Sequence, residues 1–250
     1  MNRRSMLCLL GAACAARISS AAGWQAYTPP QDLKGIWGFV PDPLLPNVLL
    51  IGDSISIGYT LDVRRLLRGK ANVYRPMEPG GKTPANCGNT KEGLADLASW
   101  LGDKKWSVIH FNWGQHDLCY RSPQSKVYGH RDKLHGVQDV PLPQYRENLE
   151  ALVEQLRKAD ARLIWATTTV IPQGEAGRFV GDEVRYNTVA AEIMRANGIS
   201  VDDLYAVTRG FPATMFDRPG DVHYTRDGFQ EIAEQVTSHI RQQLKPHRAD

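Results

Sequence analysis

The chain has 250 residues, of which 42% are hydrophobic and 23% are charged, a composition typical of a soluble globular protein with one sizeable core. Its formal net charge is +3, but the first 22 residues hold three arginines and no acidic residue. Without these three, 27 of the 30 basic residues remain and balance the 27 acidic residues. A neutral chain lacks the basic surface that nucleic acids and anionic membranes bind, so the composition disfavours both partners.

Residues 1–22 have the features of a signal peptide. Arg3 and Arg4 precede an apolar, alanine-rich stretch (5–16) that is too short to span a bilayer, and small residues follow at 20–22. We expect cleavage before Gly23 and export to the periplasm or the medium, and the paired arginines are compatible with either the Sec or the twin-arginine route. No later segment is long and apolar enough for a membrane span.

The remaining chain begins with an irregular segment, 23–46, that is rich in proline and aromatic residues. From residue 47 to 250, short apolar runs alternate with patterns of helical period. Strands are expected at 48–51, 71–75, 107–112 and 162–170 and within 199–207; helices are expected at 59–68, 91–101, 145–158 and 182–196 and from Thr225 onward. Residues 118–140 have little periodicity and are predicted to be an inserted loop. The alternation predicts one domain with a central parallel sheet, a three-layer α/β/α sandwich of the flavodoxin-like kind.

Ligand sites in such folds lie at the carboxyl ends of the strands. This rule selects the polar residues that follow the expected strands: Asp53 and Ser54, residues 114–117, residues 167–169, and Asp221 with His223. A serine between a buried strand and a helix has its backbone N–H near the helix N-terminus, where it can stabilise an oxyanion. A Gly-Asp-Ser triplet taken alone is better explained by a serine that caps the helix.

The rest of the chain favours the catalytic interpretation, because it resembles the SGNH (GDSL-like) hydrolases. The first block of that family is matched by residues 52–56 and its last block by residues 217–225. The resemblance implies that Ser54 is the nucleophile and that His223 is its general base. It also implies that the backbone N–H of Ser54 is one oxyanion donor, and it groups Asp53 with the oxyanion and substrate-binding residues.

A second oxyanion donor in this family is a glycine N–H after the second strand, and Gly88 is the best match, with Gly80 and Gly81 as competitors. The third donor is usually the asparagine of a G-x-N-D block. This chain has histidine in that slot, so His116, which can donate one imidazole N–H, is the candidate. Asn112 is the alternative.

The acid that orients the family's histidine usually lies three residues before it, yet Gly220 occupies that position. Asp221, two residues before His223, can still reach Nδ1 and is the favoured acid. The alternatives are Asp217 and a Ser–His dyad without an acid.

The resemblance implies no cofactor, and no histidine or cysteine spacing matches a zinc site, so no metal is expected. Removal of the leader would leave two cysteines in an oxidising compartment, and we consider an intrachain Cys87–Cys119 disulfide.

The function expected from the resemblance is hydrolysis of carboxylic esters through an acyl-enzyme. Export and aromatic residues near the expected site, Trp113, Tyr120 and Tyr224, favour a glycan substrate and hence a carbohydrate O-acetylesterase. The alternatives are a short-chain acyl esterase or lipase, and a non-catalytic glycan-binding or surface protein that retains the fold.

Overall fold

The computed structural model describes residues 36–124 and 130–244. The predicted signal peptide and most of the predicted irregular segment therefore lie outside the described residues, and residues 36–46 contain neither helix nor strand. Five parallel strands form the central sheet in the order β2-β1-β3-β6-β7. They are β1 (Asn47–Ile51), β2 (Asn72–Tyr74), β3 (Val108–Phe111), β6 (Arg162–Ala166) and β7 (Ser200–Asp202).

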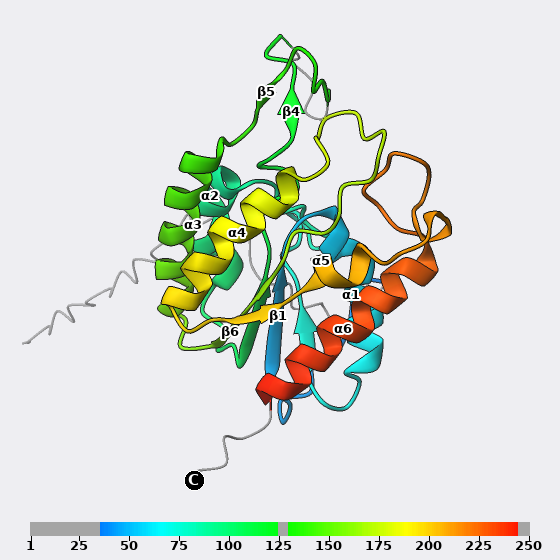
Figure 1. Ribbon diagram of the computed structural model, residues 1–250. Helices are drawn as coiled ribbons and strands as arrows, with labels where there is room; N and C mark the ends of the chain where they lie inside the picture. Colours follow the sequence, from blue (N-terminus) through cyan, green and yellow to red (C-terminus); the bar gives the residue numbers. More distant parts are fainter. Residues whose placement is uncertain (1–35, 125–129, 245–250) are drawn as a thin grey trace, which may run out of the picture.

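Helices cover both faces of this sheet (Figure 1). One face carries α2 (Thr90–Leu101), α3 (Leu142–Arg157) and α4 (Asp182–Ala196); the other carries α1 (Ser54–Leu66) and α6 (Arg226–Leu244), with the short α5 (Leu204–Thr208) near them. Two further strands, β4 (Tyr120–Arg121) and β5 (Val137–Gln138), pair antiparallel outside the main sheet. The predicted three-layer α/β/α sandwich is confirmed.

The burial of β1 explains why four of its five residues are apolar. Val48 and Leu50 pack on the side of α1 and α6, whereas Leu49 and Ile51 pack on the side of α2, α3 and α4. All four are fully buried, as expected for a central strand covered on both faces. Because β1 pairs with β2 and β3 and all three run parallel, the segments that follow them leave the sheet at the same edge.

Several element boundaries differ from those predicted. Helix α1 begins at Ser54 rather than at Tyr59, because residues 54–58, in which serines and a glycine alternate with two isoleucines, form its first turns. The last predicted strand is only three residues long, since Asp203 caps α5 immediately afterwards. The predicted loop at 118–140 contains the β4–β5 pair. In the described part of the chain, no helix has both the length and the apolar character needed to cross a bilayer.

Candidate active site

Ser54 is the first residue of α1, two residues beyond Gly52 at the end of β1. The cap of this helix is Asp53, whose Oδ1 accepts a hydrogen bond from the Ile55 N–H at 2.9 Å. Asp53 is buried, and its carbonyl also accepts a bond from the Ser56 hydroxyl at 2.8 Å. Since Asp53 performs the capping, the Ser54 side chain is not used for it, and its backbone N–H lies in the first turn, where helical N–H groups have no partner within the helix.

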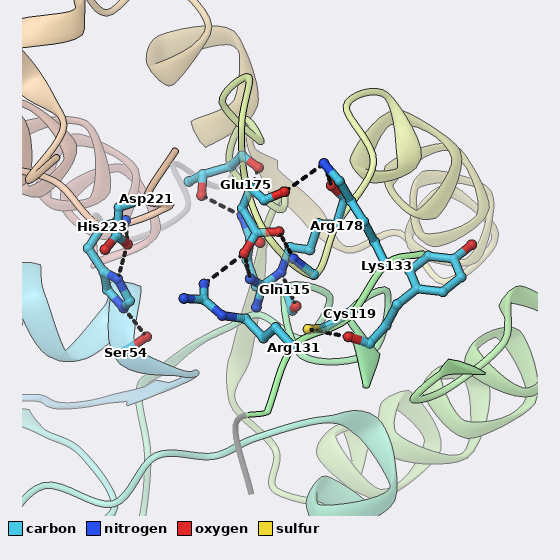
Figure 2. Close-up of polar contacts among 12 residues, drawn as sticks. Ser54, Gln115, Cys119, Arg131, Lys133, Glu175, Arg178, Asp221 and His223 are labelled. Atoms are coloured by element: carbon cyan, nitrogen blue, oxygen red, sulfur yellow. Dashed lines mark hydrogen bonds and ion pairs between the residues drawn. The ribbon is translucent and has the colours of Figure 1, made fainter. Parts of the chain in front are cut away.

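The structure brings Ser54, His223 and Asp221 together (Figure 2). Ser54 Oγ lies 2.8 Å from His223 Nε2, and His223 Nδ1 lies 2.6 Å from Asp221 Oδ1. Hydroxyl, imidazole and carboxylate thus form one hydrogen-bonded chain across 169 residues of sequence. This is the geometry in which an imidazole can remove the serine proton while a carboxylate holds its tautomer.

The Asp221 carboxylate is strongly stabilised in its charged form. Burial by itself raises the pKa of this carboxyl, but hydrogen bonds from the backbone N–H of His223, from Arg218 and from the His223 ring outweigh burial and hold the pKa well below its usual value. Asp221 therefore remains a carboxylate at any pH at which the imidazole could act as a base.

Asp217, the alternative acid, occupies a different place. Its side chain is 58% exposed and its carboxylate lies 3.8 Å from Arg218. Its contact with His223 is through the backbone, since the Asp217 N–H donates to the His223 carbonyl at 3.0 Å. The carboxylate in contact with the imidazole is that of Asp221.

Gly88 lies in the loop between β2 and α2, immediately before the helix cap Asn89. Its φ of +55° and the position of Glu92, whose Oε2 would lie 1.4 Å from an added Cβ, both favour glycine here. In this structure its N–H donates to Asn86 Oδ1 at 3.1 Å. The competitors Gly80 and Gly81 lie in a turn in which the Gly81 N–H donates to Glu78 O.

The two candidates for the third donor differ in what their side chains do. The Asn112 amide donates to the carbonyl of Ala166 at 2.7 Å and lies 3.5 Å from the Thr168 hydroxyl, so it ties β3 to the end of β6. His116 is buried, and burial lowers the pKa of its imidazole to about 4, with nearby Arg178 and Arg121 lowering it further and Asp53 opposing. The ring is therefore neutral at pH 7 and carries one N–H.

Asp117, the next residue, connects the loop after β3 to the loop that carries Gly88. Its Oδ1 accepts bonds from the Thr90 N–H at 2.8 Å and the Thr90 hydroxyl at 2.6 Å. Its Oδ2 is buried and has no hydrogen-bond partner among the described residues, and burial raises the pKa of the carboxyl to about 7. The arrangement fixes the start of α2 to the residue that follows His116.

Arg75 was not identified as a site residue from the sequence, although it contacts the turn that leads into Ser54. It is fully buried at the end of β2 and donates to the carbonyls of Gly52 at 3.3 Å and Ala85 at 2.8 Å. It also donates to the hydroxyls of Ser56 and Thr60. One guanidinium thus connects the turn before Ser54 to the loop before Gly88. The signal for it is an arginine at the end of a short, fully buried strand.

The predicted disulfide is wrong. Cys87 and Cys119 are both free thiols and both buried. Cys87 packs in the apolar core on the side of α2, α3 and α4, and burial raises the pKa of its thiol to about 12. Cys119 instead lies against the loop that contains Gly177, where an added Cβ would meet its Sγ at 3.0 Å. The two residues act as small packing side chains in different surroundings.

Of the site-mouth aromatics expected from the sequence, Trp113 and Tyr224 are core residues, at 1% and 3% exposure. Tyr120 is partly exposed and packs edge-on against Phe179 with ring centroids 5.2 Å apart. Within residues 36–124 and 130–244, no three His, Cys, Asp or Glu side chains form a group that could hold a metal ion. His110 instead bonds through Nε2 to Asp202 Oδ2 at 3.0 Å.

The Ser–His–Asp chain at the carboxyl edge of this α/β sheet has the arrangement that recurs in serine hydrolases of several folds. The family model of GDSL-like lipases and acylhydrolases matches residues 50–231, so this chain belongs to the GDSL-like lipase/acylhydrolase family, the SGNH hydrolases. No similar sequence was found among curated proteins.

Several solved structures are similar to this chain in fold. A lipase/acylhydrolase from Enterococcus faecalis is 21% identical with a TM-score of 0.62, and the match covers 82% of this chain and all of that one. The acetyl xylan esterase AlAXEase is 15% identical with a TM-score of 0.60, covering 78% and 99% of the two chains. A catalytic mutant of an acetylxylan esterase from Geobacillus stearothermophilus is 16% identical with a TM-score of 0.59, covering 78% and 94%. At these identities the similarity concerns the fold.

Proposed function

We propose that this protein is an exported serine esterase that hydrolyses carboxylic esters through an acyl-enzyme and that its substrates are O-acetylated carbohydrates. The observation that carries the proposal is the hydrogen-bonded chain from Ser54 Oγ through the His223 ring to Asp221, at 2.8 and 2.6 Å. Export is inferred from the sequence of residues 1–22.

In the proposed reaction, Ser54 Oγ attacks the ester carbonyl while His223 Nε2 accepts the hydroxyl proton. The resulting imidazolium is stabilised by the Asp221 carboxylate, and it returns the proton to the leaving alkoxide oxygen as the tetrahedral intermediate collapses to the acyl-enzyme. Water then attacks the acyl-enzyme by the same route with His223 as base, which releases the carboxylic acid and restores Ser54.

The negative charge on the carbonyl oxygen needs donors in place before the reaction. The N–H of Ser54 at the start of α1 is the first of them, and the Gly88 N–H is the second, once substrate displaces the side chain of Asn86 from it. We propose His116 rather than Asn112 as the third, because His116 occupies the position of the family's donor asparagine and its buried, neutral imidazole carries one N–H. A neutral imidazole can also donate to the oxyanion without adding a net charge to the site.

Carbohydrate esters are proposed as substrates on two grounds. Export would place the protein where polymeric glycans occur, and two of the solved structures with the same fold are acetyl xylan esterases. The partly exposed Tyr120–Phe179 pair offers a surface on which the apolar face of a sugar ring can pack.

The experiment that tests this function has two stages. Labelling with a fluorophosphonate should modify wild-type protein and not Ser54→Ala; failure to label the wild type would identify a non-catalytic protein that retains the fold. Hydrolysis of acetylated oligosaccharides and of aryl esters with acyl chains of two to twelve carbons should then be compared. We expect kcat/KM to be highest for acetyl sugars. A maximum at long acyl chains would identify a lipase instead.

A further inference from the structure

Three loop segments form a small platform beside the triad, and the catalytic scheme above does not use its charged side chains. The segments are 119–122, 130–133 and 174–179, which we call the cationic platform. Backbone hydrogen bonds join all three, from the Tyr120 N–H to Gly177 O at 2.6 Å, from the Asp132 N–H to Tyr120 O at 3.1 Å and from the Lys133 N–H to Ala176 O at 3.2 Å. The platform is therefore one structural unit rather than three independent loops.

The cationic platform is attached to the catalytic residues at two points. Gly174 lies against Gly220, the residue before Asp221, so closely that a Cβ on Gly220 would lie 2.8 Å from Gly174 O. Arg178 Nε donates to Gln115 O at 2.7 Å, directly before His116. The platform thus contacts both the loop of the triad acid and the loop of the proposed oxyanion donor.

At the centre of the platform, one buried carboxylate holds two guanidinium groups. Glu175 Oε1 accepts bonds from Arg131 Nη1 at 2.7 Å and from Arg178 Nη1 at 2.8 Å, while its Oε2 accepts the Gly177 N–H at 2.6 Å. Lys133 adds a third cation, and its Nζ donates to the backbone carbonyl of Glu175 at 2.6 Å. Glu175 can neutralise only one of these three charges, so the cluster retains positive charge.

The remaining charged side chains of the platform do not offset this excess. Asp132 directs its carboxylate toward the backbone N–H groups of Leu134 and His135. Arg121 is paired with Asp139, which lies outside the platform. The four basic and two acidic residues of the three segments therefore leave a net positive surface next to the triad.

Arg131 is the member of this cluster that is placed to bind a ligand. Arg178 and Glu175 have side chains that are 6% and 0% exposed, whereas that of Arg131 is 36% exposed. Among the described residues, its Nε and Nη2 make no hydrogen bond, because Glu175 occupies only Nη1. Figure 2 shows its guanidinium on the side of the cluster that faces Ser54 and His223.

The free Nε–Nη2 edge of a guanidinium matches two terminal oxygens of one anionic group. A partly exposed aromatic pair, Tyr120 with Phe179, adjoins the cluster, and Lys133 Nζ lies 5.6 Å from the Phe179 ring centroid. A cation next to an accessible aromatic face suits an acidic sugar better than an alkyl chain, which would desolvate the ammonium group without a compensating bond.

We propose that Arg131 is a specificity-determining residue that binds an anionic group of the substrate, so that the preferred substrates are esters of acidic sugars. A uronate carboxylate and a sugar phosphate present the same pair of oxygens to the guanidinium edge. The inference rests on the proposed esterase function for its biological meaning, but the binding site can be tested without any turnover.

The binding test uses three sugars that differ only at carbon 6: galacturonate, galactose 6-phosphate and galactose. Dissociation constants are measured by NMR titration of the wild-type protein, of Arg131→Met and of Arg131→Lys. We expect at least one acidic sugar to bind about tenfold more tightly than galactose, the difference that one charge-assisted contact provides. Arg131→Met should abolish this difference, Arg131→Lys should retain part of it, and added NaCl should reduce it.

The matched control is Arg157→Met, which removes the same charge from the end of α3, where Arg157 bonds to Asn197. It should leave the preference for the acidic sugar intact, and a loss of preference there would mean that only the overall charge of the protein matters. The dissociation constants of the two acidic sugars show which anion the site prefers. Tighter binding of galacturonate indicates a carboxylate, and tighter binding of galactose 6-phosphate indicates a phosphate. Equal affinity of all three sugars for the wild-type protein would overturn the inference.

Turnover supplies a second measurement. The ratio of kcat/KM for O-acetylated polygalacturonate to that for acetylated xylan should fall about tenfold in Arg131→Met, mainly through KM. An unchanged ratio in an active enzyme would overturn the role of Arg131 and leave the esterase function standing. Absence of fluorophosphonate labelling would overturn the esterase function and leave the sugar titration as the test of the binding site.

Discussion

Gly220 and Gly174 are in backbone contact, and both have positive φ angles, +73° and +83°. Gly220 directly precedes Asp221, and Gly174 directly precedes Glu175. The contact therefore holds the loop of Asp221 against the loop of Glu175. A side chain on Gly220 would collide with Gly174 O and would also strain its own backbone, whereas Gly174 requires glycine only for its positive φ. The orientation of Asp221 thus depends on close packing between two loops far apart in sequence.

This contact predicts the behaviour of Gly220→Ala. The added Cβ would meet Gly174 O at 2.8 Å, so one loop must move, and we expect kcat to fall as Asp221 shifts relative to His223. Gly69→Ala is the control, because Gly69 has a similar φ of +68° and no atom within 4 Å of its added Cβ. Both variants should lose about 1 kcal/mol or more of stability from backbone strain, measured by urea unfolding. Equal kcat values for the two variants would contradict this account.

Replacement of Ser54 or of His223 by alanine should each abolish turnover of an activated aryl acetate and leave the melting temperature nearly unchanged. The 2.8 Å contact between Ser54 Oγ and His223 Nε2 implies that the two side chains act as one unit. The double variant should therefore be no slower than either single variant. The measurement is kcat of all three proteins, and activity of a single variant within tenfold of wild type would refute the assignment.

Arg75→Met tests whether the buried guanidinium positions the site. Its loss leaves the Ala85 carbonyl without the bond at 2.8 Å and removes the guanidinium that links Gly52 to Ala85, so that the Cys87 N–H, which donates to Gly52 O at 3.2 Å, must hold the two loops together. A buried acceptor left unsatisfied costs roughly 1–3 kcal/mol, so we expect a lower free energy of unfolding together with a lower kcat. A purely structural role predicts normal kcat for the folded fraction at low temperature. Arg75→Lys should recover stability better than kcat, because an ammonium group lacks the planar fork.

The sequence predicts the helices and strands whose apolar residues repeat at a regular spacing, and it does not predict the contacts between irregular loops. Strand β1 and helix α6 have regular apolar patterns, and their positions follow from those patterns. The position of Ser54 follows from the strand that precedes it. The Cys87–Cys119 bridge is expected only from the number of cysteines and the compartment, whereas the orientation of the two side chains depends on tertiary packing, which leaves both thiols free. The cluster around Glu175 joins residues from aperiodic loops, and no local pattern indicates that they meet.

His116→Ala should lower kcat by on the order of 100-fold and change KM little, because an oxyanion donor acts chiefly in the transition state. His116→Asn should recover part of the loss, since its amide also offers an N–H. Steady-state kinetics with an aryl acetate provide both constants. If Asn112→Ala has the larger effect on kcat, the donor is Asn112, and the Ala166 bond must open during catalysis.

The neighbours His116 and Asp117 should affect the pH dependence of stability in opposite directions. Burial lowers the pKa of His116 to about 4, below its unfolded value near 6.5, so between these values the unfolded chain binds a proton that the folded chain does not. Acidification through this range therefore destabilises the fold through His116. Burial raises the pKa of Asp117 to about 7, above its unfolded value near 3.9, so acidification from pH 7 stabilises the fold through Asp117.

Single substitutions should separate these two contributions. Asp117→Asn keeps an acceptor for Thr90 but removes the stabilising proton, so its free energy of unfolding should fall more steeply than that of wild type between pH 7 and pH 4.5. His116→Asn removes the opposing contribution, so its free energy should fall less steeply or rise. Urea unfolding of the three proteins at both pH values gives the slopes, and each comparison with wild type cancels the groups that all three share. Parallel slopes would show that neither side chain changes its proton affinity on folding.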